Sequence, residues 1–277
     1  MQVLILGCGD IGSRVGLSLL DRGWCVAAAR RNPDRLPDKF DRHKVNLTEP
    51  ASWGALDALA PNYVVVTPTP QSHDPAGYQA GFATLARTLA SQEWIARCRR
   101  VIWVSSTRVY RESEGGWVDE QSPLNLDEAQ AGSMIAGEAA VRRAATATIV
   151  RPAGVYGDPK GMLMRRVQAG QGGATGALYG NRIHREDLAR LIVHCIDRDA
   201  AGQSVPPTVV GADHDQTPTH EIEDWLADQI GVTLTRPSDP SPLRANRRCR
   251  NALLERIRFQ LSYPTWREGY EGTLGQR

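Results

Sequence analysis

A glycine-rich turn near the start of the chain has the residue types and spacing that bind phosphate groups. It reads Gly7-Cys8-Gly9-Asp10-Ile11-Gly12, follows an apolar run at residues 3–6 and opens a helical pattern at residues 11–22. Such glycines allow a tight turn and close approach of a pyrophosphate, and the helix N-terminus favours negative charge. A second apolar strand at residues 24–30 completes a βαβ unit. The pattern therefore predicts dinucleotide binding rather than a merely structural turn.

A pair of basic residues, Arg30 and Arg31, ends that second strand. A protein that binds NAD(H) places Asp or Glu there to hold the ribose 2′-hydroxyl, whereas arginine suits the 2′-phosphate of NADP(H). The alternative is a solvated basic turn, because arginines are common in loops. We expect NADP(H) in preference to NAD(H).

The composition narrows the class of protein. The chain has 277 residues, of which 41% are hydrophobic and 23% charged, as in ordinary globular proteins. Its net charge of +2 gives no reason to expect nucleic acid or an anionic membrane as a partner. The five cysteines lie far apart without metal-ligand spacing, which favours free thiols in a reducing compartment and no bound metal. With no leader and no apolar run of about 20 residues, we expect a soluble, cytoplasmic protein.

Alternating strand and helix patterns predict an α/β fold with a doubly wound parallel sheet of the Rossmann type. Residues 1–155 are assigned to a dinucleotide-binding domain, and residues 156–277 to a smaller α/β substrate lobe, with about 184–211 returning to the first domain. The glycines of residues 170–180 predict a mobile loop or hairpin. Further strands are expected near residues 43–47, 63–67, 101–105, 147–150 and 205–211, and helices at 78–97, 129–145, 184–197 and 220–230.

Three further segments resemble a known superfamily. Val104-Ser105-Ser106-Thr107-Arg108-Val109-Tyr110 is similar to the "SS-x-x-VYG" segment of extended short-chain dehydrogenases/reductases, the group of NAD-dependent epimerases and dehydratases. Arg151-Pro152-Ala153-Gly154-Val155-Tyr156-Gly157 resembles their "RPxxVYGP", and the segment from Asn181 to Ala189 resembles their "x-F-I-H-V-D-D-L-A". The segments 246–249 and 263–270 further resemble an atypical bacterial subgroup, the YeeZ-like proteins.

The glycine turn, the basic pair and the resemblance together give a set of candidate cofactor-binding residues: Gly7, Gly9, Asp10, Ile11, Gly12, Arg30, Arg31, Thr67, Ser105, Arg151, Pro152 and Val155.

The resemblance also implies a Tyr-x-x-x-Lys pair on the helix after the serine segment, and this chain lacks it. In the superfamily the Tyr exchanges a proton with substrate, while the Lys lowers the pKa of that Tyr and holds the nicotinamide ribose. Glu138 matches an acidic residue four positions after the Lys, and this register puts Gln130 and Met134 at the two sites. No Tyr or Lys lies between Val118 and Tyr156. Neither an amide nor a thioether titrates near neutral pH, so the standard mechanism cannot run.

Other residues are candidates for the missing chemistry. Ser106 matches the superfamily's hydroxyl that bonds the substrate oxygen, and is the candidate catalytic residue; it could equally cap the turn after its strand. Thr107, Tyr156 and His184 are weaker substrate-site candidates, with packing or joining of the lobes as the alternative for Tyr156 and His184. Tyr110, Asp187 and His73 complete the candidates, and Arg244, Arg247, Arg248 and Arg250 are either a solvated face or an anion site.

Two functions from different classes follow. The first is an NADP(H)-dependent oxidoreductase, epimerase or dehydratase that acts on a small polar or sugar-like substrate with non-standard catalytic residues. The second is a non-catalytic NADP(H)-binding module that signals redox state to a partner, which the missing pair favours. In either case we expect a monomer or a homodimer.

Overall fold

The computed structural model describes residues 1–173, 176, 178–237 and 246–275, which form two compact units. The first comprises Met1–Val109, Leu124–Arg151 and Ala189–Val209, and the second comprises Tyr110–Pro123, Pro152–Leu188 and Val210–Arg277. Both units therefore include segments that are distant in sequence. Among the described residues, no helix is long and apolar enough to cross a membrane.

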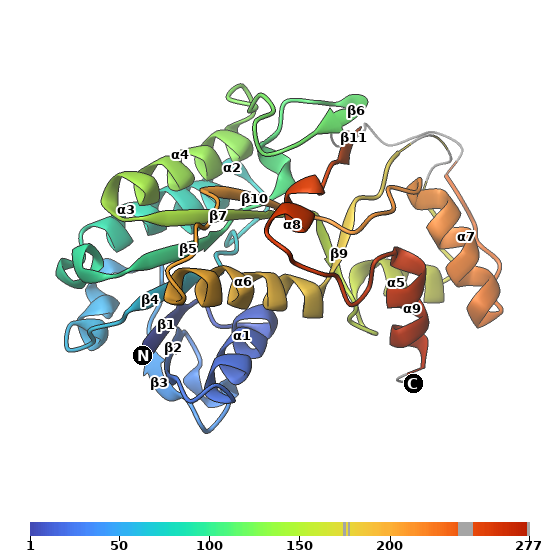
Figure 1. The fold of residues 1–277 in the computed structure, drawn as a ribbon. Coiled ribbons are helices and arrows are strands. Elements are labelled where there is room, and N and C mark those ends of the chain that lie inside the picture. Colours follow the sequence, from blue (N-terminus) through green and yellow to red (C-terminus); the bar gives the residue numbers. More distant parts are fainter. Residues whose placement is uncertain (174–175, 177, 238–245, 276–277) are drawn as a thin grey trace. The chain divides into compact units, whose positions relative to one another are not determined.

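The first unit is built on a seven-stranded sheet in the order β10-β7-β5-β4-β1-β2-β3 (Figure 1). The β1–β4 and β1–β2 pairs are parallel, as are β2–β3, β4–β5 and β5–β7. All four residues of β4 are buried, as expected for a strand covered on both faces. The strands are β1 Gln2–Leu6, β2 Cys25–Arg30, β3 Asp41–Lys44, β4 Tyr63–Val66, β5 Arg100–Val104, β7 Ala147–Pro152 and β10 Thr208–Gly211.

Helices cover both faces of this sheet, with α1 and α6 on one side and α3 and α4 on the other (Figure 1). The predicted doubly wound α/β fold is confirmed. The helices are α1 Asp10–Leu20, α2 Pro75–Tyr78, α3 Leu85–Ala90, α4 Ala129–Ala144 and α6 Arg185–Ala200, with short 3₁₀ turns η1 Pro33–Arg35, η2 Pro50–Leu56, η4 Glu93–Arg97 and η5 Thr107–Val109.

The helix predicted at 78–97 differs from the observed structure. It begins at Pro75, capped by the side chain of Asp74, and is divided by the π-helix η3 (Gln79–Thr84). Cβ atoms at Gly77 and Gly81 would meet the backbone of the preceding loop, at Ser72 and Thr69 respectively. The two glycines thus allow the loop after β4 to fold back over α2 and η3.

The second unit contains two small parallel pairs, β6–β11 and β8–β9. Its core joins Tyr156, Met164, Ile222, Trp266 and Tyr270. Residues 110–123 group with this unit because β6 pairs with β11, a pair that the sequence did not reveal. Its elements are β6 Glu114–Val118, β8 Gly154–Tyr156, α5 Met162–Gln168, β9 Arg182–His184, α7 Thr219–Ile230, β11 Asn246–Cys249, α8 Ala252–Arg256 and α9 Trp266–Leu274.

The loop predicted at residues 170–180 is partly described. Gln171 bridges to Thr235 and Tyr179 to Pro218, and the amide of Gly173 donates to the buried carboxylate of Glu223 at 2.8 Å. Residues 174, 175 and 177 lie outside the described residues.

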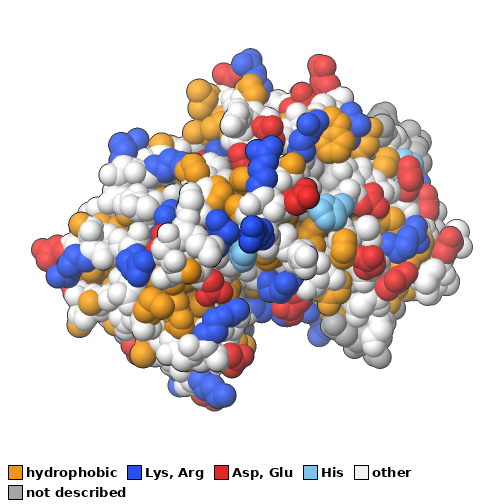
Figure 2. Space-filling view, viewed as in Figure 1, with side chains coloured by type: hydrophobic (Ala, Val, Ile, Leu, Met, Phe, Trp, Pro, Cys, Tyr) orange, Lys and Arg blue, Asp and Glu red, His pale blue; other side chains and the backbone are white. Residues whose placement is uncertain are grey.

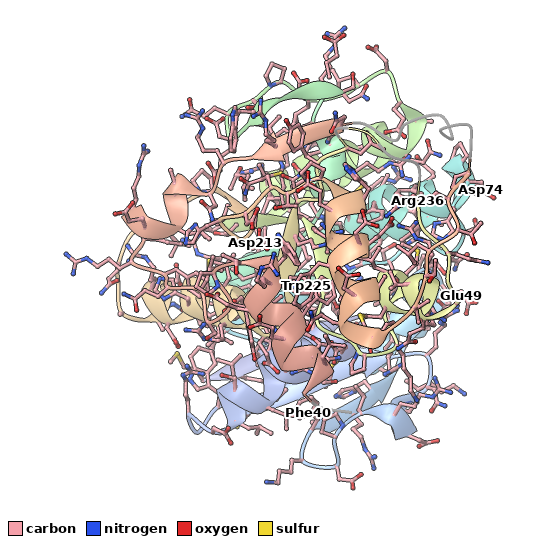
Figure 3. All side chains as sticks on the ribbon, turned by 90° about the vertical axis from the view of Figure 1, so that its right-hand side faces the viewer. Phe40, Glu49, Asp74, Asp213, Trp225 and Arg236 are labelled. Atoms are coloured by element: carbon pink, nitrogen blue, oxygen red, sulfur yellow. The ribbon has the colours of Figure 1, made fainter. Side chains whose placement is uncertain are left out.

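The second unit also contains a buried carboxyl group with one oxygen that has no hydrogen-bond partner among the described residues. Asp213 (labelled in Figure 3) is completely buried; its Oδ1 accepts from the amide of Asp215 at 3.2 Å, and its Oδ2 has no partner among the described residues. Burial raises the pKa of Asp213 to about 8, although Arg182 lowers it. A buried acid without a strong ion pair favours its neutral form.

This carboxyl gives a pH-dependent stability. The folded-state pKa lies above the value of 3.8 expected for an unfolded chain, so the folded state holds an extra proton between about pH 4 and pH 8. The contribution of Asp213 to the free energy of unfolding therefore falls as pH rises through this window. In urea titrations from pH 5 to pH 9, Asp213→Asn should lose part of the decline seen in the wild type, whereas Asp215→Asn should keep it. Parallel profiles for wild type and Asp213→Asn would contradict this assignment.

Candidate functional site

The glycine turn is held between the two strands that flank β1. The amides of Gly7 and Cys8 donate to the carbonyl of Ala29 in β2, at 3.0 and 3.2 Å. On the other side, Thr67, directly after β4, donates its hydroxyl to the carbonyl of Gly7 at 2.8 Å. Gly7 has φ +75°, and a Cβ there would lie 2.7 Å from the carbonyl oxygen of Thr67. Only glycine suits this position without displacing the turn.

The other two glycines have different roles. A Cβ on Gly9 would meet only the carbonyl oxygen of Gly7, at 3.8 Å, so the space above Gly9 is open. Gly9 is the N-cap of α1 and supplies no side-chain cap, which leaves the first amides of the helix available to an anion. A Cβ on Gly12 would lie 2.9 Å from Ile5 Cγ2, so this glycine lets α1 pack closely on β1. This geometry fits a dinucleotide diphosphate.

The rest of α1 supports this geometry. Gly16 packs against the ring of Phe40, labelled in Figure 3, so α1 stays close to the sheet along its length. Ile11 is half-buried, and exposed Asp10 pairs with Arg14 at 3.1 Å. Burial raises the pKa of the Cys8 thiol to about 11, so this cysteine of the turn stays protonated near neutral pH.

Positive charge gathers beside the turn, at the ends of β2 and β3. Arg30 is the last residue of β2 and stands opposite Lys44 of β3 in the parallel register. Arg31 follows and is exposed. The sequence did not single out Lys44, because its place opposite Arg30 depends on the pairing of β3 with β2. Arg30 and Arg31 thus stand at the end of β2, where an NAD(H)-binding protein carries a carboxylate.

Two predicted cofactor-binding residues belong to a buried ion-pair network. Arg151 donates to both carboxylate oxygens of Glu138, at 3.1 and 2.6 Å, and Ser105 donates to the same carboxylate at 2.5 Å. All three side chains are less than a tenth exposed. The network ties β5, α4 and β7 together below the site. Contact of Ser105 or Arg151 with a cofactor remains a prediction.

The segment after β5 places Ser106 and Thr107 at the carboxyl edge of the sheet. The hydroxyl oxygen of Ser106 accepts from the amide of Arg108 at 3.2 Å, which is the turn-capping role weighed from the sequence. A hydroxyl that accepts one bond still has its proton to donate, so capping does not preclude a substrate contact. Thr107 begins η5.

Helix α4 carries Gln130 and Met134, the residues predicted at the superfamily's Tyr and Lys positions. Met134 is 2% exposed and packs in the core. The side-chain Nε2 of Gln130 makes a weak contact of 3.5 Å with the backbone carbonyl of His73. His73 itself is exposed. Neither side chain can exchange a proton with substrate near neutral pH.

The candidates of the second unit are engaged in packing. Tyr156 lies with its ring 4.7 Å from that of Tyr270, and its hydroxyl donates to the carbonyl of Thr265 at 3.3 Å. Burial raises the pKa of Tyr156 far above its ordinary value. The His184 ring lies 3.8 Å from Tyr263, and buried Asp187 accepts from the amides of Ser262 and Tyr263. Tyr110 and Pro152 are buried, and Val155 is exposed.

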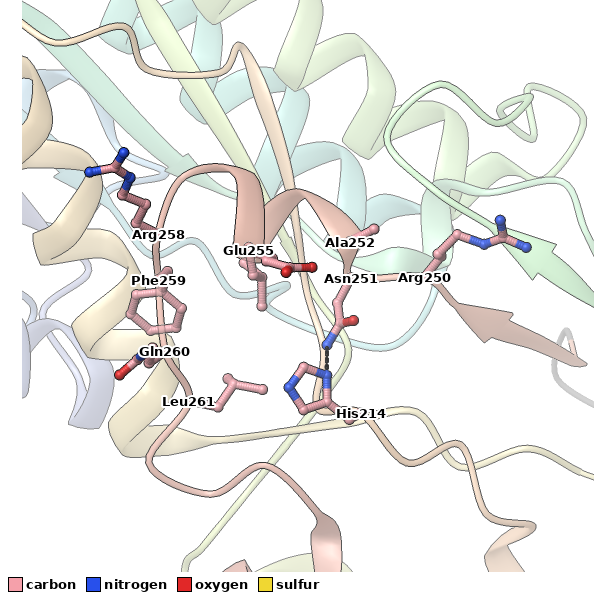
Figure 4. A pocket seen from close by; sticks show the side chains of 10 residues that line it. His214, Arg250, Asn251, Ala252, Glu255, Arg258, Phe259, Gln260 and Leu261 are labelled. Carbon is pink, nitrogen blue, oxygen red and sulfur yellow. Dashed lines mark hydrogen bonds between the residues drawn. The ribbon is translucent and has the colours of Figure 1, made fainter.

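The three described arginines of the C-terminal cluster, Arg247, Arg248 and Arg250, make different contacts. Arg247 is 5% exposed and Arg248 lies against the rings of Trp117 and Tyr179, while Arg244 lies outside the described residues. Arg250 lines a pocket of about 900 Å³, where Asn251 and the Nδ1 of His214 are 2.9 Å apart. Figure 4 shows Arg250 and Arg258 on opposite sides of this pocket. Acidic and basic side chains are interspersed on the face in Figure 2.

The sheet order, the open turn and the helix N-terminus of the first unit define a Rossmann-type dinucleotide-binding protein. The chain belongs to the NAD(P)H-binding family, whose model matches residues 7–199. Its cofactor is therefore a nucleotide of the NAD(P) type. The sequence matches no curated protein.

Solved structures support the same assignment. A protein from Methylobacillus flagellatus described as an NAD-dependent epimerase/dehydratase is similar to 99% of this chain and 98% of its own, with 27% identity and a TM-score of 0.84. The UDP-glucose 4-epimerase of Thermus thermophilus, solved with NAD, shares the fold at 19% identity and a TM-score of 0.79, over 99% of this chain and 98% of its own. The predicted resemblance to the epimerase/dehydratase type of short-chain dehydrogenase/reductase is confirmed.

The buried network allows a direct test of its role. Glu138→Ala leaves the Arg151 guanidinium buried without its carboxylate, which should lower the free energy of unfolding by about 3–5 kcal/mol. The double variant E138Q/R151M should recover most of this loss, because it removes both charges. Exposed Glu93→Ala is the control and should change stability by less than about 0.5 kcal/mol. A loss below about 1 kcal/mol for Glu138→Ala, measured by urea unfolding, would show that the pair is not structural.

Proposed function

We propose that this protein is an NADP(H)-dependent oxidoreductase of the epimerase, dehydratase or reductase type, acting on a small polar or sugar-like carbonyl or alcohol. The observation that carries the proposal is that the turn with open space above Gly9 is bonded to β2, the strand that ends in Arg30. A diphosphate on the α1 N-terminus directs the adenosine ribose towards the end of β2. Arg30, Arg31 and Lys44 are the residues available there to a 2′-phosphate.

The chain's own residues divide the work of such an enzyme. The amides at the start of α1 bind the diphosphate, and Thr67 holds the turn in its binding conformation. The hydroxyl of Ser106 donates a hydrogen bond to a substrate oxygen at the carboxyl edge of β5. When bound, the nicotinamide would supply or accept the hydride. The free thiols suit a protein that works in the reducing cytoplasm. We propose that it works there as a monomer or a homodimer.

Calorimetric titration with NADPH, NADP+, NADH and NAD+ tests the nucleotide site. Gly9→Asp should abolish binding of all four, because its carboxylate enters the space that the diphosphate needs. Arg30→Ala should weaken NADPH and NADP+ by roughly tenfold to a hundredfold, the effect of losing one charge-assisted hydrogen bond, and should leave NADH nearly unchanged.

Arg35→Ala is the matched control, since Arg35 is an exposed arginine on the neighbouring turn η1. It should bind all four nucleotides as the wild type does. No binding of any dinucleotide by the wild type would refute the proposal, and equal affinity for NADPH and NADH would refute its preference for NADP(H).

A second function, a non-catalytic NADP(H) sensor, is favoured by one observation. Met134 is packed into the core where a catalytic Lys would reach the nicotinamide ribose. A sensor must bind the two redox states with unequal affinity, since a ligand shifts a conformational equilibrium only by its differential affinity. The same titrations decide this, because equal affinities for NADPH and NADP+ exclude redox sensing.

A further inference from the structure

A tyrosine outside the family motifs and an arginine at an unspecified position of one of them come together at the carboxyl edge of the sheet. Tyr78 ends α2, which follows β4, and Arg108 lies in η5, which follows β5. The Nη1 atom of Arg108 is 3.4 Å from the Tyr78 hydroxyl, and its guanidinium lies 5.1 Å from the ring centroid. Because β4 and β5 are neighbouring parallel strands, both residues stand where open α/β sheets bind ligands.

The surroundings fix the pair in place. The Tyr78 ring stacks on Phe82 with centroids 5.7 Å apart, and Phe82 packs edge-on against buried Trp103 of β5. Arg108 is bound by Glu128, the N-cap residue of α4, through two nitrogens. The side chains of Arg108 and Glu128 are each about a third exposed, and Tyr78 is half-buried, so solvent reaches this cluster.

The backbone around Tyr78 is also unusual. The π-helix η3 starts at the next residue, and such turns are rare and frequently mark functional sites. Ser133 of α4 contacts the side chain of Gln79 at 3.2 Å, so this turn is held on the helix that carries Gln130. Glu128, the partner of Arg108, stands only two residues before Gln130. The pair thus lies beside the helix end from which the superfamily's tyrosine would act.

The geometry points to Tyr78 as the proton donor that replaces the missing tyrosine, with Arg108 as its positioning residue. This inference rests on the proposed NADP(H)-dependent function. Tyr78 gives its phenolic proton to the oxygen of a substrate carbonyl whose carbon accepts a hydride from a reduced nicotinamide. The O–H bond of Tyr78 breaks and an O–H bond forms on the substrate, which becomes an alcohol while the nicotinamide is oxidised. Arg108 stabilises the phenolate until water returns the proton.

Tyr179 offers a matched control inside the same chain. It is half-buried like Tyr78, and an arginine, Arg248, lies 4.8 Å from its ring centroid. Both tyrosine rings therefore contact an arginine. Of the two hydroxyls, that of Tyr78 contacts a guanidinium among the described residues. Nitration by tetranitromethane, which attacks phenolate, can be followed at both residues by mass spectrometry.

The nitration rate tests the pair without any substrate. Tyr78 should react faster than Tyr179, because its hydroxyl contacts the Arg108 guanidinium. Arg108→Met should remove this advantage, and Arg108→Lys, which keeps the charge, should restore much of it. Equal rates at Tyr78 and Tyr179, or a rate at Tyr78 that Arg108→Met leaves unchanged, would overturn the pairing. Circular dichroism of each variant shows whether it is folded.

Protection by nucleotides tests the location of Tyr78. Saturating NADP+, which carries a nicotinamide, should slow nitration of Tyr78, while 2′,5′-ADP, which lacks it, should not. Protection by both or by neither, with calorimetry showing that both bind, would remove Tyr78 from the nicotinamide end of the site. If calorimetry detects no binding of either nucleotide, the proposed function fails together with the proton-transfer role, a result separate from the nitration comparison.

Discussion

The bonding of the Gly7 turn to both neighbours of β1 is the constraint on which the rest of the first unit depends. The amides of Gly7 and Cys8 donate to the carbonyl of Ala29 in β2. The hydroxyl of Thr67, the residue after β4, donates to the carbonyl of Gly7. β2 and β3 lie on one side of β1, and the later strands β4, β5, β7 and β10 lie on its other side, so the order of the sheet reverses direction at β1. A ligand at this switch point can therefore reach β2 with one end and the β4–β5 edge with the other.

This arrangement separates binding from chemistry. We propose that binding uses backbone amides and the cations at the ends of β2 and β3, which the sheet holds in register. The proposed chemistry uses side chains that follow β4 and β5. The absence of Tyr and Lys from α4 therefore leaves the proposed nucleotide-binding groups in place, and Met134 of this helix packs in the core. The Glu138–Arg151 pair keeps α4 fixed to the sheet although the helix lacks the usual catalytic residues.

Local sequence patterns predicted the features that depend on local chemistry. The glycine turn, the buried strands and the long helix α4 follow from residue types and spacing, because each forms from neighbouring residues. Glu138 binds both Ser105 and Arg151, and local patterns did not reveal these bonds because the residues are far apart in sequence; contact of Ser105 and Arg151 with the cofactor stays a prediction. Lys44 was missed for the same reason, since strand register decides which residue stands opposite Arg30. The β6 segment carries two glycines, so its pairing with β11 left little signal.

Hydrogen–deuterium exchange with and without saturating NADP+ tests most directly whether the turn and the basic strand ends form one nucleotide site. We expect slower exchange in peptides covering the start of α1 and the segment after Arg30, with peptides of β6 and β11 unchanged. NAD+ should protect the first peptide more than the second, because it lacks the 2′-phosphate. Protection confined to the second unit, or none at the start of α1, would contradict the account.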